Sequence, residues 1–320
     1  MHSELKNLIP PLDSSRHKGE RGRIGVIGGS PEYSGAPYFS AVSALKLGAD
    51  LAHVFCPASI ASVIKSYHPD LIVHPFLNLS SSDDIQSIID VLPRLHAVVI
   101  GPGLGRHPST LPVLQQIVAH IRSLDMPLVV DADGLWFVNQ QLDLVQGYEK
   151  AILTPNAMEF SRLVKSVGLS VSGSATDGHS FDNDDGNLVK ELSLKLNGPV
   201  IVRKGKSDVI SDGKLIIHCS NKGSACRCGG QGDLLSGSVA LFSFWASIQA
   251  DARKDTVWSP LMAGSFAACA LTRECNRLAF SLERNGAPLQ DSMTTQDMVS
   301  VIHVAKRNLF LPDSSPLRDL

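Results

Sequence analysis

Short apolar runs rich in β-branched residues alternate with longer stretches rich in alanine and leucine, beginning at Arg23. This alternation is typical of βα units that assemble into a parallel sheet. The runs are almost continuously apolar, as expected for strands covered by helices on both faces. We therefore predict strands at residues 24–27, 51–55, 97–100, 128–130, 151–153 and 200–202.

The pattern changes in the second half of the chain. Asp212-Gly213 separates two apolar segments, residues 208–210 and 214–217, which predicts a hairpin at the edge of the sheet. Helical patterns dominate afterwards, at residues 234–248, 259–278 and 295–308, so we expect a helical layer to complete the fold. Residues 168–186 are rich in serine, glycine and aspartate and lack periodicity, which indicates a surface insertion.

Composition narrows the class of protein. The chain has 320 residues, of which 43% are hydrophobic and 19% charged, ordinary values for a globular protein with a substantial core. Since α/β enzymes of this length often form one domain, we expect a single domain over residues 1–320. The 29 basic and 31 acidic residues give a net charge of -2 with no basic stripe, which argues against nucleic acid or an anionic membrane as a partner.

The cysteines and the N-terminal region favour a cytoplasmic protein. The six cysteines are scattered, and the close pair Cys226 and Cys228 lacks the spacing of a zinc site, so we expect reduced thiols. Charged residues and Pro10-Pro11 lie where a signal peptide would need an apolar run. No window approaches the roughly 20 apolar residues that a membrane-spanning helix requires. The sequence leaves open the oligomeric state, a homo-oligomer included, and an organelle-targeted form made from another start.

Two glycine-rich loops follow predicted strands. Gly28-Gly29-Ser30, with Tyr33-Ser34-Gly35-Ala36-Pro37 after it, permits close backbone approach, and Ser34 is placed to cap the next helix. A tight turn explains this loop as well as a ligand site does. Gly101-Pro102-Gly103-Leu104-Gly105 exposes main-chain amides that suit a phosphate or a sugar. Its proline and its spacing exclude a Gly-x-Gly-x-x-Gly dinucleotide fingerprint.

Carboxylates follow two further strands. Asp131-Ala132-Asp133-Gly134 places two of them at a strand end, where they suit a metal or hydroxyl groups, although Asp133 as a helix cap is equally compatible. In Thr154-Pro155-Asn156, the asparagine precedes Glu159 by three residues, so both side chains project from one side of a helix. They form either a site for hydrated Mg²⁺ or a plain capping box.

The strongest motif is Cys228-Gly229-Gly230-Gln231-Gly232-Asp233, in which three glycines precede a helix that is apolar nearly all round. The first amides of such a helix form an anion site at its positive end. Asp233 would compete with an anion there unless it serves chemistry, for example as a base for a hydroxyl proton. The alternative is a simple N-terminal aspartate. The polar turn Lys204-Gly205-Lys206-Ser207-Asp208 either brings ammonium groups to phosphates or is merely solvated.

With these motifs the chain resembles the ribokinase-like superfamily, whose members share a Gly-x-Gly-Asp anion hole and base. More narrowly, it resembles the ATP-dependent NAD(P)H-hydrate dehydratases over nearly its whole length. The motifs that carry the resemblance are Gly28-Gly29-Ser30 with Tyr33-Ser34-Gly35-Ala36, the loop from Gly101 to Gly105, Asp131-Ala132-Asp133-Gly134, Leu153-Thr154-Pro155-Asn156 with Glu159-Phe160, and Gly229-Gly230-Gln231-Gly232-Asp233. The resemblance implies an α/β fold of the ribokinase-like type, with a mostly parallel central sheet flanked by helices.

The resemblance also implies the ligands and their contacts. The substrates would be hydrated NADH and NADPH, with ATP as co-substrate and Mg²⁺ as its metal. The hydrated nucleotide would contact Gly103, Asn156, Ala157, Met158, Glu159, Phe160, Ser161, Arg162 and Asp233. ATP would contact Lys204, Gly205, Lys206, Ser207, Asp208, Gly223, Ser224, Ala225, Cys226, Arg227, Cys228, Gly229, Gly230, Gln231 and Gly232. We expect the Mg²⁺ to lie with ATP, near Asn156 and Glu159.

By the same resemblance, Asp233 is the catalytic base that deprotonates the hydroxyl at nicotinamide C6. ATP would phosphorylate that oxygen, and phosphate, a much better leaving group than hydroxide, would then depart. Gln231 stands where many members of the superfamily carry threonine, and in this the chain resembles the eukaryotic, ATP-using branch. Two rivals remain: a kinase for a vitamin-precursor alcohol, and a non-catalytic nucleotide-binding regulator, which would gain nothing from Asp233.

Overall fold

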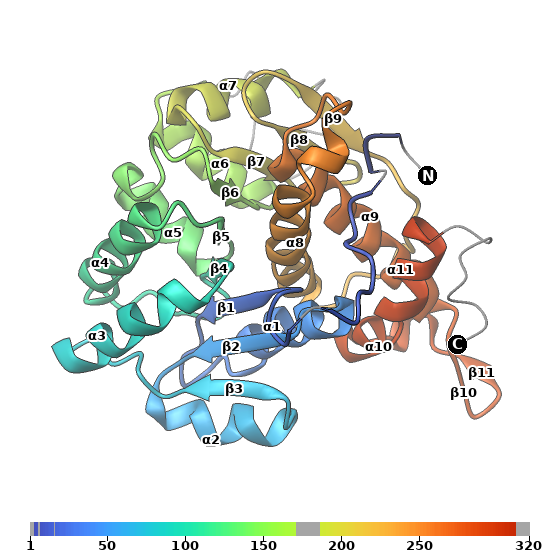
Figure 1. The fold of residues 1–320 in the computed structure, drawn as a ribbon, viewed down its shortest axis with the longest axis horizontal. Coiled ribbons are helices and arrows are strands. Elements are labelled where there is room, and N and C mark those ends of the chain that lie inside the picture. Colours follow the sequence, from blue (N-terminus) through green and yellow to red (C-terminus); the bar gives the residue numbers. More distant parts are fainter. Residues whose placement is uncertain (1–2, 6, 16, 171–185, 312–320) are drawn as a thin grey trace.

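The computed structural model describes residues 3–5, 7–15, 17–170 and 186–311. A nine-stranded sheet in the order β3-β2-β1-β4-β5-β6-β7-β8-β9 runs through it (Figure 1). Neighbours from β3 to β7 are parallel, whereas β8 and β9 are antiparallel to the strands beside them. The strands are β1 (Arg23–Ile27), β2 (Leu51–Phe55), β3 (Leu71–His74), β4 (Ala97–Ile100), β5 (Leu128–Val130), β6 (Ala151–Leu153), β7 (Val200–Arg203), β8 (Asp208–Ser211) and β9 (Ile216–Cys219).

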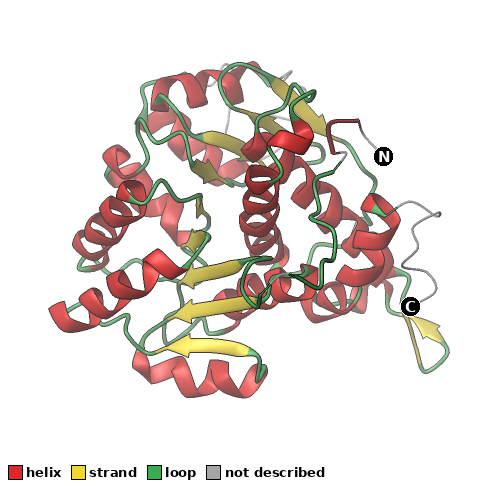
Figure 2. Cartoon of the chain, viewed as in Figure 1, coloured by secondary structure: helices red, strands yellow, loops and turns green. Residues whose placement is uncertain are grey.

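Helices cover both faces of the sheet, as Figure 2 shows. One face packs against α1 (Gly35–Leu47), α2 (Ala58–Tyr67), α8 (Gln231–Ile248), α9 (Pro260–Phe280), α10 (Thr295–Ser300) and α11 (Ile302–Phe310). The other packs against α3 (Ser82–Val91), α4 (Thr110–Ser123), α5 (Asp133–Gln140), α6 (Ala157–Ser166) and α7 (Asn187–Leu196). Among the described residues, no helix combines the length and the apolar character needed to cross a bilayer.

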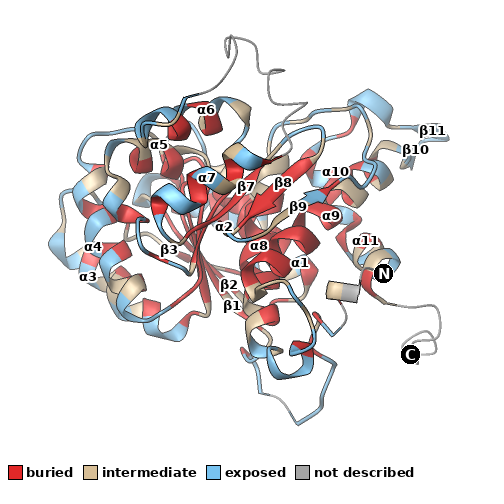
Figure 3. Ribbon diagram, turned by 90° about the horizontal axis from the view of Figure 1, so that it is seen from above, coloured by how far each residue is buried: buried red, intermediate tan, exposed pale blue. Residues whose placement is uncertain are grey.

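Successive strand residues feed two separate cores. Val26 and Val99 belong to the cluster under α1 and α8, whereas Ile27 and Ile100 belong to the cluster under α3 to α6. Both sets are buried because a strand turns alternate side chains to opposite faces of the sheet. Figure 3 shows the resulting buried centre, with the strands and α8 enclosed by more exposed outer helices. This double burial explains why the strands appear in the sequence as almost unbroken apolar runs.

The six strands and the edge hairpin predicted from the sequence are confirmed, with small shifts of their ends. The prediction missed β3, a four-residue edge strand, and the small hairpin of β10 (Glu283–Arg284) and β11 (Ala287–Pro288). The helix predicted at residues 295–308 is wrong as one element, because Val301 leaves helical geometry (φ -103°, ψ 5°) and separates α10 from α11. Of the predicted insertion, residues 171–185 lie outside the described residues.

Strand order places a crevice between β1 and β4. The chain runs from β1 outward to β2 and β3 and then returns to the other side of β1 as β4. The helices after β1 and β4, α1 and α4, lie on opposite faces of the sheet, so the two loops diverge. A crevice at such a switch point, outside the carboxyl ends of the strands, is where open α/β sheets bind ligands.

A glycine contact fixes helix α8 against α1. A Cβ on Gly237 would lie 1.9 Å from the carbonyl oxygen of Ser40, so only glycine allows the two helices to pack this closely. The Ser40 and Ser236 hydroxyls are hydrogen-bonded at 3.1 Å beside this contact. The N-terminus of α8 is therefore held in a defined place.

Candidate functional site

The two glycine-rich loops pack directly on each other at the switch point. The amide of Gly29 donates to the carbonyl of Pro102 at 2.9 Å, and a Cβ on Gly28 would lie 2.2 Å from the same oxygen. Gly103 has φ +61°, and a Cβ there would lie 2.8 Å from that of Tyr33. These glycines are needed for close backbone contact. Gly103 is buried beneath Tyr33, whereas Tyr33 itself is 59% exposed.

Ser34 does not cap the helix that follows. It occupies the N-cap position of α1, but no side-chain capping hydrogen bond forms. Its hydroxyl instead lies 2.9 Å from that of Tyr67, so the cap interaction predicted from the sequence is wrong.

A buried ion pair joins the ends of β5 and β7. Lys204 Nζ donates to Asp131 Oδ1 at 2.8 Å, with the Asp131 side chain 2% exposed and that of Lys204 21% exposed. The amide of Lys204 also donates to the carbonyl of Pro155, at 2.8 Å, which ties it to the loop after β6. Burial lowers the pKa of Lys204, but the carboxylates of Asp131 and Glu159 outweigh it, so the pKa is raised and the ammonium stays charged.

Asp133 is hydrogen-bonded to the loop after β4. Its carboxylate accepts hydrogen bonds from the amide of Gly105 at 3.0 Å and from Nε of Arg106 at 2.9 Å. It is not a helix cap, because Ala132 holds the N-cap position of α5. Ala132 has φ +48°, a rare conformation for a residue with a side chain, at the point between the two aspartates.

Asp233 lies in the first turn of α8, two residues after its start at Gln231. The first hydrogen bond of the helical ladder runs from the amide of Leu234 to the carbonyl of Gly230. The amides of Gln231, Gly232 and Asp233, which precede Leu234, therefore have no partner within the helix. A Cβ on Gly232 would lie 3.4 Å from Lys204 Nζ and 3.7 Å from Asp131 Oδ2. The start of α8 therefore lies beside the Asp131–Lys204 ion pair, with Gly232 as its nearest residue.

The Asp233 carboxylate is placed to accept a proton. Within the described residues, no donor makes a hydrogen bond to its oxygens. Burial raises the pKa of Asp233 well above its usual value, and the negative charge of Asp131 raises it further, while Lys204 opposes both. A carboxylate near free amides, with a pKa raised by burial, has the properties of a general base beside an anion site.

Asn156 and Glu159 form a capping box at the start of α6. Asn156 Oδ1 accepts from the Glu159 amide at 2.9 Å, and Glu159 Oε2 accepts from the Asn156 amide at 2.8 Å. Burial raises the pKa of Glu159, against the opposing charge of Lys204. The box uses one oxygen of each side chain, whereas Glu159 Oε1 has no hydrogen bond within the described part of the chain. No three His, Cys, Asp or Glu side chains among the described residues are grouped as a preformed metal site.

The residues of the predicted substrate segment on α6 differ in their exposure. Asn156, Met158 and Arg162 are exposed, and Ala157 is partly so. The Phe160 side chain is fully buried in the core with Arg203 over its ring, and Ser161 is 6% exposed. Phe160 and Ser161 therefore support the helix from within, and their side chains are not open to a ligand.

Arg273 of α9 fixes the first predicted ATP segment, residues 204–208. Its Nε donates to Asp208 Oδ2 at 2.7 Å, and its Nη atoms donate to the carbonyls of Gly205 (2.8 Å), Lys206 (3.0 Å) and Asn221 (3.4 Å). Asp208 Oδ1 accepts from the Gly205 amide at 3.0 Å. Asp208 is 7% exposed, so its carboxylate holds the turn together.

Asn276, one turn further along α9, fixes the second segment predicted to bind ATP, residues 223–232. Its Oδ1 accepts from the amide and the hydroxyl of Ser224, and its Nδ2 donates to the carbonyl of Cys226 at 3.1 Å. Thr295 donates to the carbonyl of Gly229 in the same segment. Gln231, the residue that departs from the usual threonine, donates to that Cys226 carbonyl at 3.4 Å and to Cys228 Sγ at 3.2 Å.

Sequence reasoning missed Arg273, Asn276 and Thr295. The one local signal is that α9, apolar up to Leu271, becomes polar at Thr272. A polar run near a helix end is ordinary, and the partners lie 50 to 68 residues away. The structure brings the other motifs together at the carboxyl ends of β1 and β4 to β7, around the start of α8.

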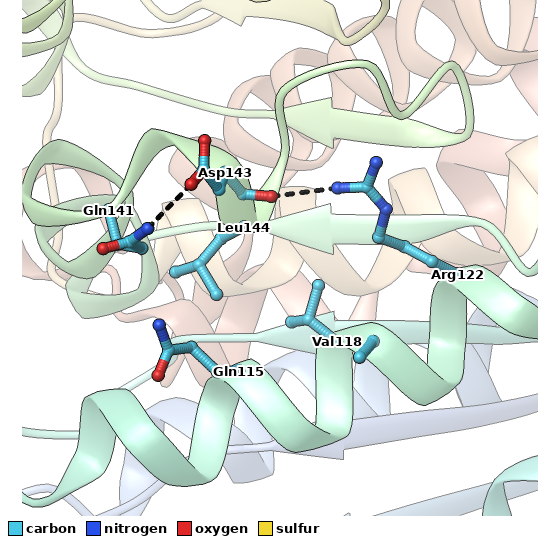
Figure 4. Close-up of a pocket in the computed structure, with 7 residues that line it drawn as sticks. Gln115, Val118, Arg122, Gln141, Asp143 and Leu144 are labelled. Atoms are coloured by element: carbon cyan, nitrogen blue, oxygen red, sulfur yellow. Dashed lines mark hydrogen bonds between the residues drawn. The ribbon is translucent and has the colours of Figure 1, made fainter.

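A cavity lies apart from this site. It has a volume of about 340 Å³ and lies between α4 and the turn Leu142–Leu144 (Figure 4). Arg122 donates to the Asp143 carbonyl at 2.9 Å, and Gln141 donates to the Asp143 carboxylate at 3.0 Å. A helix that follows a parallel strand runs back toward the amino ends of the strands. The last residues of α4 therefore lie near the amino ends of the strands, whereas the site lies at the carboxyl ends.

Solved structures define the class of fold. A ribokinase-like superfamily protein from Enterococcus faecalis matches with a TM-score of 0.73 at 20% identity, covering 94% of this chain and 93% of that one. A Bacillus subtilis ADP/ATP-dependent NAD(P)H-hydrate dehydratase, co-crystallized with ATP/Mg²⁺, matches with a TM-score of 0.67 at 21% identity, covering 93% and 94%. The fold is ribokinase-like α/β, as the sequence predicted.

Sequence comparison defines the family. The NAD(P)H-hydrate dehydratase family profile matches residues 24–283. The ATP-dependent (S)-NAD(P)H-hydrate dehydratase of Pongo abelii is 49% identical over 306 residues, covering 96% of this chain and 88% of that protein. The Homo sapiens protein of the same name is 48% identical over 307 residues, covering 96% and 83%. The chain belongs to the NAD(P)H-hydrate dehydratase family.

The raised pKa of Asp233 predicts an effect on stability. A carboxyl whose pKa is higher in the folded than in the unfolded state binds more protons when folded, so its charge costs stability increasingly as pH rises above about 4. Asp233→Asn should raise the melting temperature at pH 8, with a gain that shrinks as the pH is lowered to 5. Asp133→Asn is the control and should lower it, because that carboxylate is hydrogen-bonded. An Asp233→Asn melting temperature at or below wild type at every pH would contradict this placement.

Proposed function

We propose that the protein is an ATP-dependent (S)-NAD(P)H-hydrate dehydratase, which returns hydrated NADH and NADPH to their reduced forms and releases ADP and phosphate. Family membership at 47–49% identity to several proteins of that name supports the proposal. The observation that carries it is the Asp233 carboxylate, without a hydrogen-bond donor among the described residues, beside the free amides of α8. That arrangement pairs a base with an anion site.

In the proposed mechanism, Asp233 accepts the proton of the hydroxyl at nicotinamide C6 while that oxygen attacks the γ-phosphorus of ATP. The bond between the γ-phosphorus and the bridging oxygen breaks, and ADP leaves. The amides of Gln231, Gly232 and Asp233 stabilise the charge on the transferred phosphoryl group. The C6–O bond then breaks with help from the ring nitrogen, phosphate departs, and loss of a proton from C5 restores the double bond.

Lys204 and Mg²⁺ would both neutralise negative charge on the phosphates. The Lys204 ammonium neutralises Asp131 and adds positive charge beside Gly232, where the phosphates would lie. Mg²⁺ usually binds through substrate phosphates and one or two carboxylates and keeps several waters. Glu159 Oε1, which the capping box leaves open, would be the protein ligand, and the Mg²⁺ would neutralise charge on the phosphates.

The proposed binding segments lie around the start of α8. Hydrated nucleotide would meet Asp233 and the exposed side of α6 from Asn156 to Arg162, and ATP would meet residues 204–208 and 223–232. Their arrangement around the start of α8 supports this assignment. We also propose a single domain, supported by the continuous sheet. A cytoplasmic location is supported by six free thiols, of which Cys226 and Cys228 are partly exposed.

The direct test is incubation with hydrated NADH, Mg²⁺ and ATP. Absorbance of the dihydronicotinamide ring should return, with one ADP and one phosphate per NADH formed. Asp233→Asn should lower kcat by roughly 10²-fold or more, since an amide cannot take the hydroxyl proton. A stable phosphate ester without NADH would establish a small-molecule kinase instead, and near-normal turnover of the variant would remove Asp233 as the base.

Arg273 should affect ATP binding indirectly, because it holds the turn at residues 204–208. Arg273→Lys keeps a charge but loses the planar fork that bonds Asp208 and the carbonyls of residues 205 and 206. We expect KM for ATP to rise about tenfold, with KM for hydrated NADH unchanged. Arg277→Lys, on the same helix but paired with Glu274, is the matched control and should behave as wild type. An equal rise in both KM values would show a general loss of structure.

A further inference from the structure

Two cysteines just before α8 are open to solvent, unlike the other four. Cys226 and Cys228 are partly exposed, whereas each of the remaining cysteines is 1% exposed or less. Burial raises the pKa of the Cys56 thiol to about 11 and that of the Cys219 thiol to about 12, so both stay protonated near neutral pH. Since oxidation needs a thiolate that the oxidant can reach, Cys226 and Cys228 are the thiols that an oxidant in solution would meet first.

The two exposed sulfurs face the same short segment, residues 291–298. Cys226 Sγ lies 3.9 Å from the carbonyl oxygen of Asp291, and Cys228 Sγ lies 3.4 Å from Thr295 Oγ1. Cys228 Sγ is also 3.8 Å from Met298 Sδ. Cα atoms two residues apart in a chain are at most about 7 Å apart, which is at the upper end of the usual disulfide range. Side-chain rotation with a modest backbone shift would therefore bring the two sulfurs into bonding distance.

The surroundings of the two sulfurs differ. Gln231 Nε2 donates a hydrogen bond to Cys228 Sγ at 3.2 Å, and Cys228 precedes the first residue of α8 by three positions. The amide donor and the positive end of the helix both support the negative charge of an attacking thiolate. Cys226 Sγ instead meets a carbonyl oxygen, that of Asp291. We therefore expect Cys228 to attack an oxidant first and Cys226 to react second.

We infer that Cys226 and Cys228 form a site of reversible oxidation by a peroxide, and that the resulting disulfide weakens ATP binding. The Cys228 thiolate attacks a peroxide oxygen, so an S–O bond forms and the O–O bond breaks, and the departing hydroxide takes up a proton to give water. Cys226 then attacks the Cys228 sulfur. The S–S bond forms, the S–O bond breaks, and the leaving hydroxide takes up the proton of the Cys226 thiol. The two thiols together lose two electrons, and hydrogen peroxide is reduced to two waters.

The disulfide would disturb the loop that leads into α8. Its sulfurs lie about 2.05 Å apart, so Cys228 Sγ would leave its contacts with Gln231 and Thr295. Thr295 also donates to the carbonyl of Gly229, and a Cβ on Gly230 would lie 3.0 Å from Thr295 Oγ1. The two glycines that precede α8 therefore pack on a threonine whose other contact is lost on oxidation.

The backbone of Cys226 links the same loop to α9. Its carbonyl accepts from Asn276 Nδ2 at 3.1 Å and from Gln231 Nε2 at 3.4 Å. Drawing the Cys226 side chain toward Cys228 would shift this carbonyl and weaken both hydrogen bonds. The free amides at the start of α8 would then lose part of their support, so ATP affinity should fall. The oxidation itself is independent of the proposed function, whereas its effect on ATP rests on that function.

Peptide mapping tests the oxidation. The full-length protein is treated with equimolar hydrogen peroxide, alkylated, denatured and cut with trypsin. Cleavage after Arg227 places the two cysteines on separate peptides, residues 223–227 and 228–253. The disulfide should join these two peptides with the loss of two hydrogens, and dithiothreitol should release them. Absence of the linked pair, or earlier oxidation of any buried cysteine, would overturn the inference.

A trapping experiment tests the order of attack. In Cys226→Ser the second thiol is missing, so the sulfenic acid on Cys228 should persist and react with dimedone. The adduct should appear on the peptide of residues 228–253. If wild type forms the disulfide while this variant gives no adduct, Cys228 is not the attacking thiol and the inferred step is wrong.

Calorimetry with Mg²⁺ and a non-hydrolysable ATP analogue tests the consequence. Peroxide should raise the Kd of wild type at least about tenfold, and dithiothreitol should reverse the change. The double variant Cys226→Ser with Cys228→Ser, compared with its own untreated form, should show no change. Cys275→Ala, which removes a buried thiol on α9, is the matched control and should respond to peroxide as wild type does.

The outcomes separate the inference from the proposed function. A disulfide that forms with no change in Kd would overturn the inferred effect on ATP. An equal peroxide response in the double variant would assign the loss to another residue and would also overturn it. If untreated wild type does not bind the ATP analogue, the proposed function fails, and the peptide map still decides whether Cys226 and Cys228 are the oxidation site.

Discussion

The ion pair between Asp131 and Lys204 is the interaction on which the site depends. Asp131 is almost fully buried, and a buried carboxylate without a partner would be strongly destabilising. Lys204 supplies the partner from the end of β7, two strands away, and its own amide is held by the loop after β6. Without Lys204, the negative charges of Asp131 and Asp233 would face each other, and one would take up a proton. Beside the larger effect of burial, the two charges of the pair therefore shift the pKa of Asp233 in opposite directions.

Helix packing holds in place the segments that we propose bind ATP. Gly237 allows α8 to approach α1 closely, which fixes the free amides at the start of α8. Arg273 and Asn276, one turn apart on α9, reach two segments that are separate in the sequence, residues 204–208 and 223–226. Since α8 and α9 pack together along the sheet, the start of α8 and both segments are supported by the same pair of helices.

The sequence predicted the parts that depend on local pattern. Strands buried on both faces are continuous apolar runs, and glycines mark close backbone contacts, so the strands and the α8 motif were identified. The strand β3 was missed because it is short and buried on alternate residues at the edge of the sheet. The pairing of Lys204 with Asp131 spans 73 residues, and that of Arg273 with Asp208 spans 65, so no local pattern indicates either. The capping box of Asn156 and Glu159 and the loop contacts of Asp133 depend on side-chain geometry that the spacing of the motifs does not determine.

The pH dependence of kcat/KM tests most directly whether this pair sets the pKa of Asp233. Wild type should lose activity as the pH falls through the raised pKa of that carboxyl. In Asp131→Asn the loss should begin at lower pH, because a neighbouring negative charge is gone. In Lys204→Met it should begin at higher pH, because the opposing positive charge is gone. Opposite shifts in the two variants are the predicted result, and an acid limb that stays in place in both would contradict the account.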